Sequence, residues 1–368
     1  MNRLPLLAAA GSVLLAGFAL NAADASVQTA TFNPLRIAVV ASTGQSSFLG
    51  AVDVEVTNTS NRAVRMPGWQ LPSQYLQSDV FSVTHDGREV PYEGPMIKRG
   101  LPQASDFTVL RPGETIRTSV DLSAFYDLSN TGEYTVTYKS PLQHASLSGG
   151  QMLIASNGLP MVAQSASLKL WVDGTDQLGG SRTLKAQAKP SAGATVVNGV
   201  SYKSCSTTQI STAGSAVNAA RTYSENAKGY LNGGTVGARY TTWFGSYTSS
   251  RYSTARQHFV NIDSAIDQSG GQVTINCGCN QSYYAYVYPT RPYEIFVCKA
   301  FWSAPLTGTD SKGGTLIHEM SHFNVTAATD DHVYGQSGAK NLAASNPDQA
   351  LDNADNHEYF AENNPSQK

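Results

Sequence analysis

The sequence predicts two folded parts, an all-β immunoglobulin-like sandwich in residues 26–178 and an α+β domain in residues 201–368. Short alternating strands dominate the first part, whereas helical periodicity, short strands and all four cysteines fall in the second. The intervening residues 179–200 are rich in Gly, Ser, Ala and Pro and lack periodicity, which is typical of a linker.

Alternation of apolar and polar residues predicts the strands of the first part. Residues 52–56, 134–138 and 168–172 show this period of two, as half-buried strands do. Asp86-Gly87 is a dipeptide that favours a hairpin turn. Several short strands at intervals favour a sandwich.

The second part mixes helices with strands. The spacing of apolar residues predicts helices over residues 212–230 and 254–266. Two short runs rich in aromatic and β-branched residues, 284–288 and 295–298, predict strands of a small sheet. This mixture indicates an α+β domain.

The amino terminus has the features of a secretory signal. Met1-Asn2-Arg3 precedes an uncharged apolar run over residues 4–20, and Ala23-Asp24-Ala25 offers a small-residue cleavage site. We therefore expect a signal peptide in residues 1–25 and a secreted protein. The apolar run is short for a bilayer span and no later segment is apolar enough, so no membrane anchor is expected.

Cysteine count and net charge narrow the setting further. An even count of four in an exported chain predicts two disulfides, and a site holding zinc on all four is the disfavoured alternative. Pairing of Cys277 with Cys279 is disfavoured because residues two apart on an extended chain lie at the far edge of the Cα separation that a disulfide tolerates. The net charge of −2 and the lack of a basic stripe argue against nucleic-acid binding.

His318-Glu319-Met320-Ser321-His322 matches the H-E-x-x-H pattern of a zinc-binding helix. Residues four apart lie one turn apart on a helix, so both imidazoles can reach one ion while Glu319 faces its water. The alternative interpretation is a surface helix that carries two histidines by chance and binds no metal.

The local pattern predicts how this helix begins and which face it buries. Leu316, Met320 and Phe323 would face a core, which leaves the two histidines and Glu319 on the side open to solvent or substrate. Residues 313–314 are glycines, and Thr315 after them is available as a helix cap.

A catalytic zinc needs three protein ligands and one open position, so a third ligand must come from outside the helix. The sequence offers five acidic or histidine side chains downstream of His322: Asp330, Asp331, His332, Asp355 and Glu358.

Residues 329–335, Thr-Asp-Asp-His-Val-Tyr-Gly, resemble the G-T-x-D-x-x-Y-G motif of the aspzincins, the family of deuterolysins and peptidyl-Lys metalloendopeptidases. The resemblance implies a zincin-like metallopeptidase fold, with Asp331 as the third zinc ligand and Tyr334 stabilising the oxyanion. The leading glycine of the motif is Ala328 here, a departure that bears on the turn rather than on the ligand.

The likeness extends over nearly all of residues 201–368, because 240–245 and 301–305 also resemble the Lys-specific branch. It implies the disulfides Cys205–Cys277 and Cys279–Cys298. It also implies that the first part is a propeptide, which assists folding and inhibits the active site; a permanent binding module is the competing interpretation.

These residue types suit hydrolysis by one Zn²⁺ per chain. Zinc lowers the pKa of its bound water from about 16 to about 7 and polarises a carbonyl. Glu319 is the expected general base, which takes the proton of the water and delivers it to the leaving amine. Tyr334 would donate to the developing oxyanion.

Two further acids predict a preference for lysine. Ser345 followed by Pro347 predicts a helix over residues 347–362, on which Asp355 and Glu358 are neighbours on one face. Carboxylates that close repel unless a cation lies between them, so a substrate ammonium would relieve the cost. Acids that merely solvate a surface helix are the alternative.

The same positions resemble the Asn-Ala-Asp-x-x-Glu stretch of peptidyl-Lys metalloendopeptidases, whose acids select lysine just after the cleaved bond. Deuterolysins of broader specificity lack the Glu, so Glu358 separates the two branches. A gluzincin scheme would instead make Glu358 the third zinc ligand and leave Asp331 in a loop. The matched Asp, Tyr and Gly spacing favours Asp331.

The sequence thus predicts a secreted zinc endopeptidase, made as a zymogen, that cleaves proteins and peptides on the amino side of lysine. Lys185, Lys189 and Lys203 lie in or beside the linker, so the enzyme could process itself there. A secreted adhesin or binding protein with a structural zinc is the alternative of a different class, but no fourth protein ligand is evident.

Overall fold

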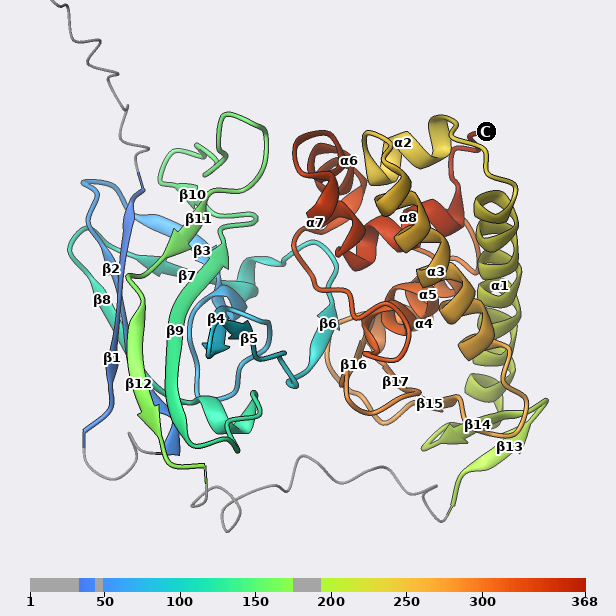
Figure 1. Ribbon diagram of the computed structural model, residues 1–368, viewed down its shortest axis with the longest axis horizontal. Coiled ribbons are helices and arrows are strands. Elements are labelled where there is room, and N and C mark those ends of the chain that lie inside the picture. Colours follow the sequence, from blue (N-terminus) through green and yellow to red (C-terminus); the bar gives the residue numbers. More distant parts are fainter. Residues whose placement is uncertain (1–32, 44–48, 175–192) are drawn as a thin grey trace, which may run out of the picture. The chain divides into compact units, whose positions relative to one another are not determined.

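The computed structural model describes residues 33–43, 49–174 and 193–368 (Figure 1), and residues Asn33–Lys368 form one compact unit. The predicted signal peptide and most of the predicted linker, with Lys185 and Lys189, lie outside the described residues. Among the described residues, no helix has the length and apolar character needed to cross a bilayer.

The described residues between 35 and 172 form β-strands joined by loops and turns, three of which are 3-10 turns. Three sheets have the strand orders β1-β2-β8, β10-β3-β7 and β11-β9-β4-β5, with β12 also paired to β9. The strands are β1 (Leu35–Ala41), β2 (Ala51–Asn58), β3 (Val64–Pro67), β4 (Phe81–His85), β5 (Arg88–Glu89), β6 (Met96–Lys98), β7 (Phe107–Leu110), β8 (Thr115–Asp121), β9 (Gly132–Pro141), β10 (Ser146–Leu147), β11 (Val162–Gln164) and β12 (Leu168–Val172). The 3-10 turns are η2 (Gly68–Gln70), η3 (Ala104–Asp106) and η4 (Leu122–Ala124).

The strands predicted from alternation are confirmed as β2, β9 and β12. In β2 every second residue is buried, which is the period that the sequence shows. Asp86 and Gly87 have φ values of 51° and 73° and connect β4 to β5, as a tight hairpin turn requires. The immunoglobulin-like topology stays a prediction.

Residues 195–362 mix helices and strands, as the α+β prediction requires. The strands are β13 (Thr195–Val197), β14 (Val200–Lys203), β15 (Thr274–Asn276), β16 (Ala285–Val287) and β17 (Glu294–Val297). The helices are α1 (Thr207–Asn232), α2 (Ala238–Phe244), α3 (Ser249–Ile266), α4 (Lys299–Ser303), α5 (Lys312–His322), α6 (Gly335–Ser345), α7 (Pro347–Leu351) and α8 (Ala354–Glu362).

The sheet of this region has the order β13-β14-β15-β17-β16-β6. Strand β13 lies inside the range predicted as linker, and β6 at the other edge comes from the middle of the N-terminal strands. β6 runs antiparallel to β16, with Lys98 opposite Ala285 and Met96 opposite Val287 (Figure 1). A segment of the predicted propeptide therefore completes the sheet of the predicted catalytic domain.

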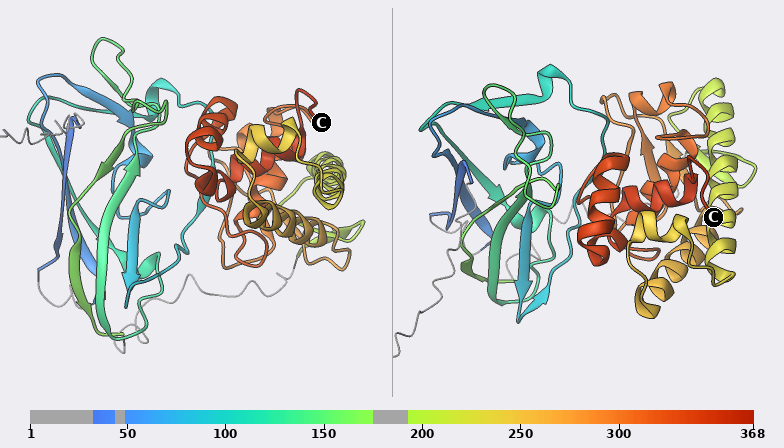
Figure 2. Two further views of the ribbon diagram at one scale, coloured as in Figure 1. Left: turned by 45° about the horizontal axis from the view of Figure 1, so that its top comes forward. Right: turned by 90° about the horizontal axis from the view of Figure 1, so that it is seen from above.

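Helices α1, α3 and α8 surround α5, and the views in Figure 2 show α1 and α3 side by side. Small residues on α1 allow this close packing, since Ala213, Ala216 and Ala220 are fully buried. Both helices begin earlier than predicted, because Ser206 forms a capping box before α1 and Thr248 caps α3.

The predicted start of the H-E-x-x-H helix is wrong. α5 begins at Lys312, where the Ser311 hydroxyl caps it by accepting from the Gly314 N–H, so both glycines are helical. A Cβ on Gly313 would lie 2.9 Å from the Ala219 Cβ, and one on Gly314 would lie 2.1 Å from Oε1 of Glu362. The glycines therefore let α5 lie close to α1 and α8.

The single helix predicted over 347–362 is wrong as well, since it divides into α7 and α8 around residues 352–353. Asn346, not Ser345, caps α7. At the break, the Asp330 N–H donates to the Asp352 carbonyl over 2.7 Å, and its own carbonyl accepts from Ala354. Hydrogen bonds to Asp330, in the loop after α5, thus replace backbone hydrogen bonds that a continuous helix would have made at this point.

All four cysteines are paired. Disulfides join Cys205 to Cys277 and Cys279 to Cys298, the pairing that the resemblance implies. The first fixes the start of α1 to the end of β15, and the second fixes the loop before β16 to the end of β17.

Candidate active site

Helix α5 carries three of the predicted site residues, and all are fully buried. The sequence places His318, Glu319 and His322 on a side open to solvent or substrate, but in the structure none of them faces solvent, because each is 0% exposed. Helix α8 and strand β6 contact α5 and cover this face. A polar helix face that looks exposed in the sequence is covered by segments distant along the chain.

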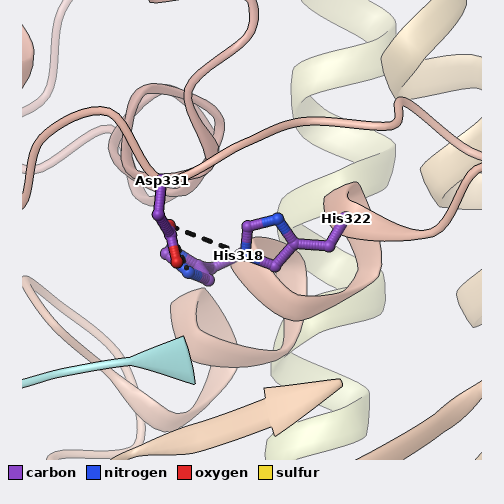
Figure 3. A group of neighbouring side chains, drawn as sticks. All are labelled: His318, His322 and Asp331. Atoms are coloured by element: carbon purple, nitrogen blue, oxygen red, sulfur yellow. Dashed lines mark ion pairs between the residues drawn. The ribbon is translucent and has the colours of Figure 1, made fainter. Parts of the chain in front are cut away.

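His318, His322 and Asp331 converge on one point (Figure 3). Oδ1 of Asp331 lies 3.3 Å from Nε2 of His318 and 3.6 Å from Nε2 of His322. Ligands at about 2.0–2.1 Å from a tetrahedral ion are separated by roughly 3.3–3.4 Å, so these distances suit a single ion.

The opposite nitrogens of both imidazoles face acceptors. Nδ1 of His322 lies 2.7 Å from the Thr329 carbonyl, and Nδ1 of His318 lies 2.9 Å from Oδ1 of Asp355. Each acceptor favours the tautomer with hydrogen on Nδ1, which leaves Nε2 free as a ligand. Neither acceptor was predicted for this role, since the sequence assigns Asp355 to the lysine pocket and gives Thr329 no role.

Unsatisfied atoms test whether the residues fit a metal ion. Nε2 of each histidine and Oδ1 of Asp331 are buried and have no hydrogen-bond partner among the described residues. Buried polar atoms without partners are rare and costly in folded proteins. Two imidazoles and one carboxylate form a donor set that zinc accepts, so the three residues fit that ion.

Electrostatics at the three residues are dominated by burial and by their mutual charges. Burial favours neutral Asp331, but His322 and His318 hold the pKa of that carboxyl below its ordinary value. Burial lowers the pKa of His322 to about 4. Burial also lowers the pKa of His318, but the charge of Asp331 outweighs it and holds that pKa well above its ordinary value. Metal binds the ionised carboxylate and neutral imidazoles, so binding must displace a proton from His318.

Glu319 lies in the same buried space with both carboxyl oxygens unpartnered among the described residues. Burial raises its pKa to about 8, against the opposing effect of His318. A carboxyl group with a raised pKa beside a ligand cluster can accept and release a proton near neutral pH.

Tyr334 precedes α6, and its hydroxyl oxygen lies 2.9 Å from Oδ2 of Asp331 and 3.0 Å from the Ile97 carbonyl oxygen. Burial and the charge of Asp331 raise its pKa well above the ordinary value, so the phenol stays protonated. The hydroxyl can therefore donate one hydrogen bond, either to the carboxylate or to a carbonyl.

Asp355 and Glu358 lie one turn apart on α8, as predicted, and both face Lys98 of β6. Nζ of Lys98 lies 3.2 Å from Oδ1 of Asp355 and 2.5 Å from Oε2 of Glu358. Asp310, which the sequence did not single out, lies 4.0 Å from the same ammonium and accepts from the Tyr359 hydroxyl. Three acids therefore line one lysine-filled pocket.

The other candidate ligands turn elsewhere. His332 lies 2.9 Å from Asp352, and Asp330 accepts from the Asp331 N–H. Glu358, the gluzincin candidate, approaches Nδ1 of His318 at 3.4 Å, on the side of the ring away from Asp331. Among the described residues, Asp331 is the one acid whose carboxylate lies within 4.0 Å of both Nε2 atoms.

Asn353 joins the loop after α5 to α8. Its side-chain oxygen accepts from the backbone N–H groups of His332 and Val333, and its amide donates to Asn356 over 2.7 Å. Ala328 in the same loop has a φ of 50°, the left-handed conformation that glycine adopts more readily. The departure from the motif thus lies where the backbone needs a positive φ.

The chain is similar to known metallopeptidases. The family described as Lysine-specific metallo-endopeptidase (aspzincin M35) matches residues 231–362. An "Extracellular protease" of Aeromonas hydrophila is 42% identical over 86% of this chain and 88% of its own. A "Peptidyl-Lys metalloendopeptidase" of Armillaria mellea is 36% identical over 90% of this chain and 95% of its own.

A solved structure, "zinc peptidase from Grifola frondosa", is 46% identical and covers 45% of this chain and 100% of its own, with a TM-score of 0.43.

Proposed function

Because this chain belongs to the aspzincin family and is a metalloendopeptidase, we propose that it binds one Zn²⁺ and cleaves peptide bonds on the amino side of lysine. His318, His322 and Asp331 would hold the ion. The observation that carries the proposal is a lysine ammonium between Asp355 and Glu358, beside these ligands.

When bound, the ion polarises the scissile carbonyl and acidifies a water molecule at its open position. Glu319 takes a proton from this water as its oxygen bonds to the carbonyl carbon. The same carboxyl group returns the proton to the lysine nitrogen when the C–N bond breaks.

Tyr334 stabilises the oxyanion in this proposal. Its hydroxyl leaves Asp331 and donates to the carbonyl oxygen as negative charge develops there, an interaction that strengthens in the transition state. The 3.0 Å contact with the Ile97 carbonyl supports this role, because it places a peptide carbonyl within reach of the phenol.

The lysine preference rests on charge and burial. A buried pair of carboxylates is costly unless a cation compensates it, and the short distances to Lys98 indicate room for an ammonium. A neutral side chain in the same pocket would leave both acids unpaired. The enzyme should therefore strongly disfavour substrates with a neutral side chain at this position, since a site that binds a polar group rejects analogues that lack that group.

We also propose that the protein is secreted after loss of residues 1–25 and is made as a zymogen, with residues 26–178 as propeptide, 179–200 as linker and 201–368 as protease. Processing at Lys203, just after this linker, is disfavoured by its position in β14. Its strand pairs with β15, and its ammonium lies 3.0 Å from Glu294, so cleavage there would require the sheet to open.

The test is digestion of one denatured protein of known sequence by the processed enzyme, with and without a chelator. New amino termini should be lysines, and the chelator should abolish them. Glu319→Gln should bind zinc and cut nothing, whereas Asp331→Ala should lose tight zinc binding. Termini without lysine enrichment would contradict the specificity, and cleavage that survives metal removal would contradict the mechanism.

A further inference from the structure

Strand β6 occupies the edge of the sheet that borders the active site. Met96, Ile97 and Lys98 pair antiparallel with β16, whose other side is paired with β17. A free sheet edge binds extended peptides through its backbone groups. A segment of the chain's own N-terminal part therefore lies on the edge that an extended substrate would use.

Lys98 occupies the acidic pocket. It is 2% exposed, and its ammonium contacts Asp355 and Glu358. Burial opposes its charge, but Asp355 and Glu358 keep the pKa of Lys98 well above its ordinary value. The pocket thus holds a charged lysine, the side chain that the proposed specificity requires.

The peptide bond before Lys98 has the position of a bond to be cleaved. The carbonyl oxygen of Ile97 is the acceptor 3.0 Å from the Tyr334 hydroxyl, and that hydroxyl also contacts Asp331. Cleavage on the amino side of lysine breaks the bond that follows this type of carbonyl. The pairing of β6 with β16, the place of the Lys98 side chain and the place of the Ile97 carbonyl therefore all fit a peptide aligned for cleavage between residues 97 and 98.

The neighbouring residue anchors the segment. The guanidinium of Arg99 lies 4.5 Å from the ring centres of both Trp69 and Tyr283, and it donates to Gln77. Cation–π contacts on two rings restrict Arg99, so Lys98 is held in the pocket from the next position along the chain.

We propose that residues 96–98 are a built-in pseudosubstrate, with Lys98 in the lysine pocket and the Ile97–Lys98 bond in the scissile position, so that the intact chain excludes lysine-containing substrates. This inference rests on the proposed function. Intramolecular ligands act at effective concentrations in the millimolar range. External peptides must therefore compete with Lys98 until the N-terminal part leaves.

The experiment measures peptide binding rather than turnover. Full-length chain carrying Glu319→Gln stays intact and is loaded with zinc. A fluorescein-labelled hexapeptide with one central lysine is titrated against it, and the dissociation constant is read from anisotropy. Lys98→Met in this background removes the ammonium that competes for Asp355 and Glu358, and Lys139→Met, which changes an exposed lysine on β9, is the matched control.

Lys98→Met should bind the peptide at least about tenfold more tightly than the parent, while Lys139→Met should match the parent. If Lys98→Met loses zinc or native circular dichroism, Lys98→Arg replaces it, since a guanidinium compensates the acids but fits an ammonium pocket less well. The Lys98→Arg variant should bind the peptide at least about threefold more tightly than the parent. Equal affinity of the parent and the folded Lys98 variants would overturn the pseudosubstrate.

A second peptide separates this inference from the proposed function. The matched peptide has norleucine in place of lysine. Tighter binding of both peptides to Lys98→Met would support the pseudosubstrate but contradict the lysine preference. Tighter binding of the lysine peptide alone would support both.

Discussion

Oδ1 of Asp355 lies 2.9 Å from Nδ1 of His318 and 3.2 Å from Nζ of Lys98. One carboxylate therefore faces both a predicted metal ligand and the cation in the lysine pocket. Burial would keep this acid neutral, but Lys98 and His318 hold the pKa of Asp355 well below its ordinary value. The two parts of the site share one charge.

Asp355→Asn should weaken zinc binding about 10- to 100-fold, because the amide orients His318 less firmly than a carboxylate does. Competition with a chromogenic chelator measures the effect. Asp352→Asn is the control, since Asp352 is half exposed and contacts His332 rather than His318. Unchanged zinc affinity in Asp355→Asn would remove Asp355 from the support of His318.

The Glu358→Gln enzyme should still bind zinc but should discriminate less well between lysine and a neutral side chain in the substrate. The substituted amide removes a charge-assisted contact worth about 2–3 kcal/mol, so the preference of the processed enzyme for lysine over norleucine should fall roughly 100-fold in kcat/KM. Zinc content and peptide kinetics are measured together, with exposed Glu225→Gln as control. Lost zinc in Glu358→Gln would instead favour a ligand role.

Gly314→Ala should destabilise the chain by about 2–3 kcal/mol. The new Cβ would lie 2.1 Å from Oε1 of Glu362, and displacing that carboxyl breaks its hydrogen bonds from the Ser311 N–H and hydroxyl. Urea denaturation of the Glu319→Gln chain gives the free energy of unfolding. Gly229→Ala, where a Cβ meets nothing within 4 Å, should stabilise by up to about 1 kcal/mol.

Glu362→Gln should change how stability depends on pH. Burial and the charge of Glu358 raise the pKa of Glu362 to about 8, from an ordinary value of 4.5. Folding therefore favours the protonated acid, and this stabilisation, complete below pH 4.5, is lost as pH rises to 8.

Relative to the parent chain, Glu362→Gln should gain at least about 1 kcal/mol between pH 5 and pH 9, since one pKa unit corresponds to about 1.4 kcal/mol. Thermal unfolding across this range checks the prediction, and Glu225→Gln controls for the loss of one charge. A stability difference that does not vary with pH would contradict it.

Ala328→Gly should stabilise the chain by up to about 1 kcal/mol. The left-handed conformation costs an L-residue about 1–2 kcal/mol, of which the extra entropy of unfolded glycine cancels part. Ala327→Gly is the control and should destabilise, because Ala327 has no positive φ. Denaturation midpoints distinguish the two signs.

Local sequence signals predicted the parts of the site that lie close together in the chain. His318 and His322 are spaced by one helical turn, whereas Asp331 was distinguished from the other downstream candidates by the resemblance of residues 329–335 to the aspzincin motif. Asp355 and Glu358 likewise follow from helical periodicity, even though α8 begins later than expected. Strands with clean alternation, such as β2, were equally accessible.

Contacts between distant segments could not be predicted in this way. Lys98 and Asp355 are 257 residues apart, and no pattern around either indicates the other. The burial of α5 and the break before α8 have the same origin, because β6 covers the first and Asp330 pairs at the second. Periodicity describes one element at a time, whereas these features arise from packing.

Asn353 acts as a rigid spacer. By holding the backbone of His332 and Val333 with its oxygen and Asn356 with its amide, it keeps the loop of Asp331 at a set offset from α8. Under the proposed function, the recognised lysine and the attacked carbonyl cannot drift apart by a residue. The position of the cleaved bond relative to the recognised lysine is then fixed by the fold of the enzyme. It does not depend on the other residues of the substrate peptide.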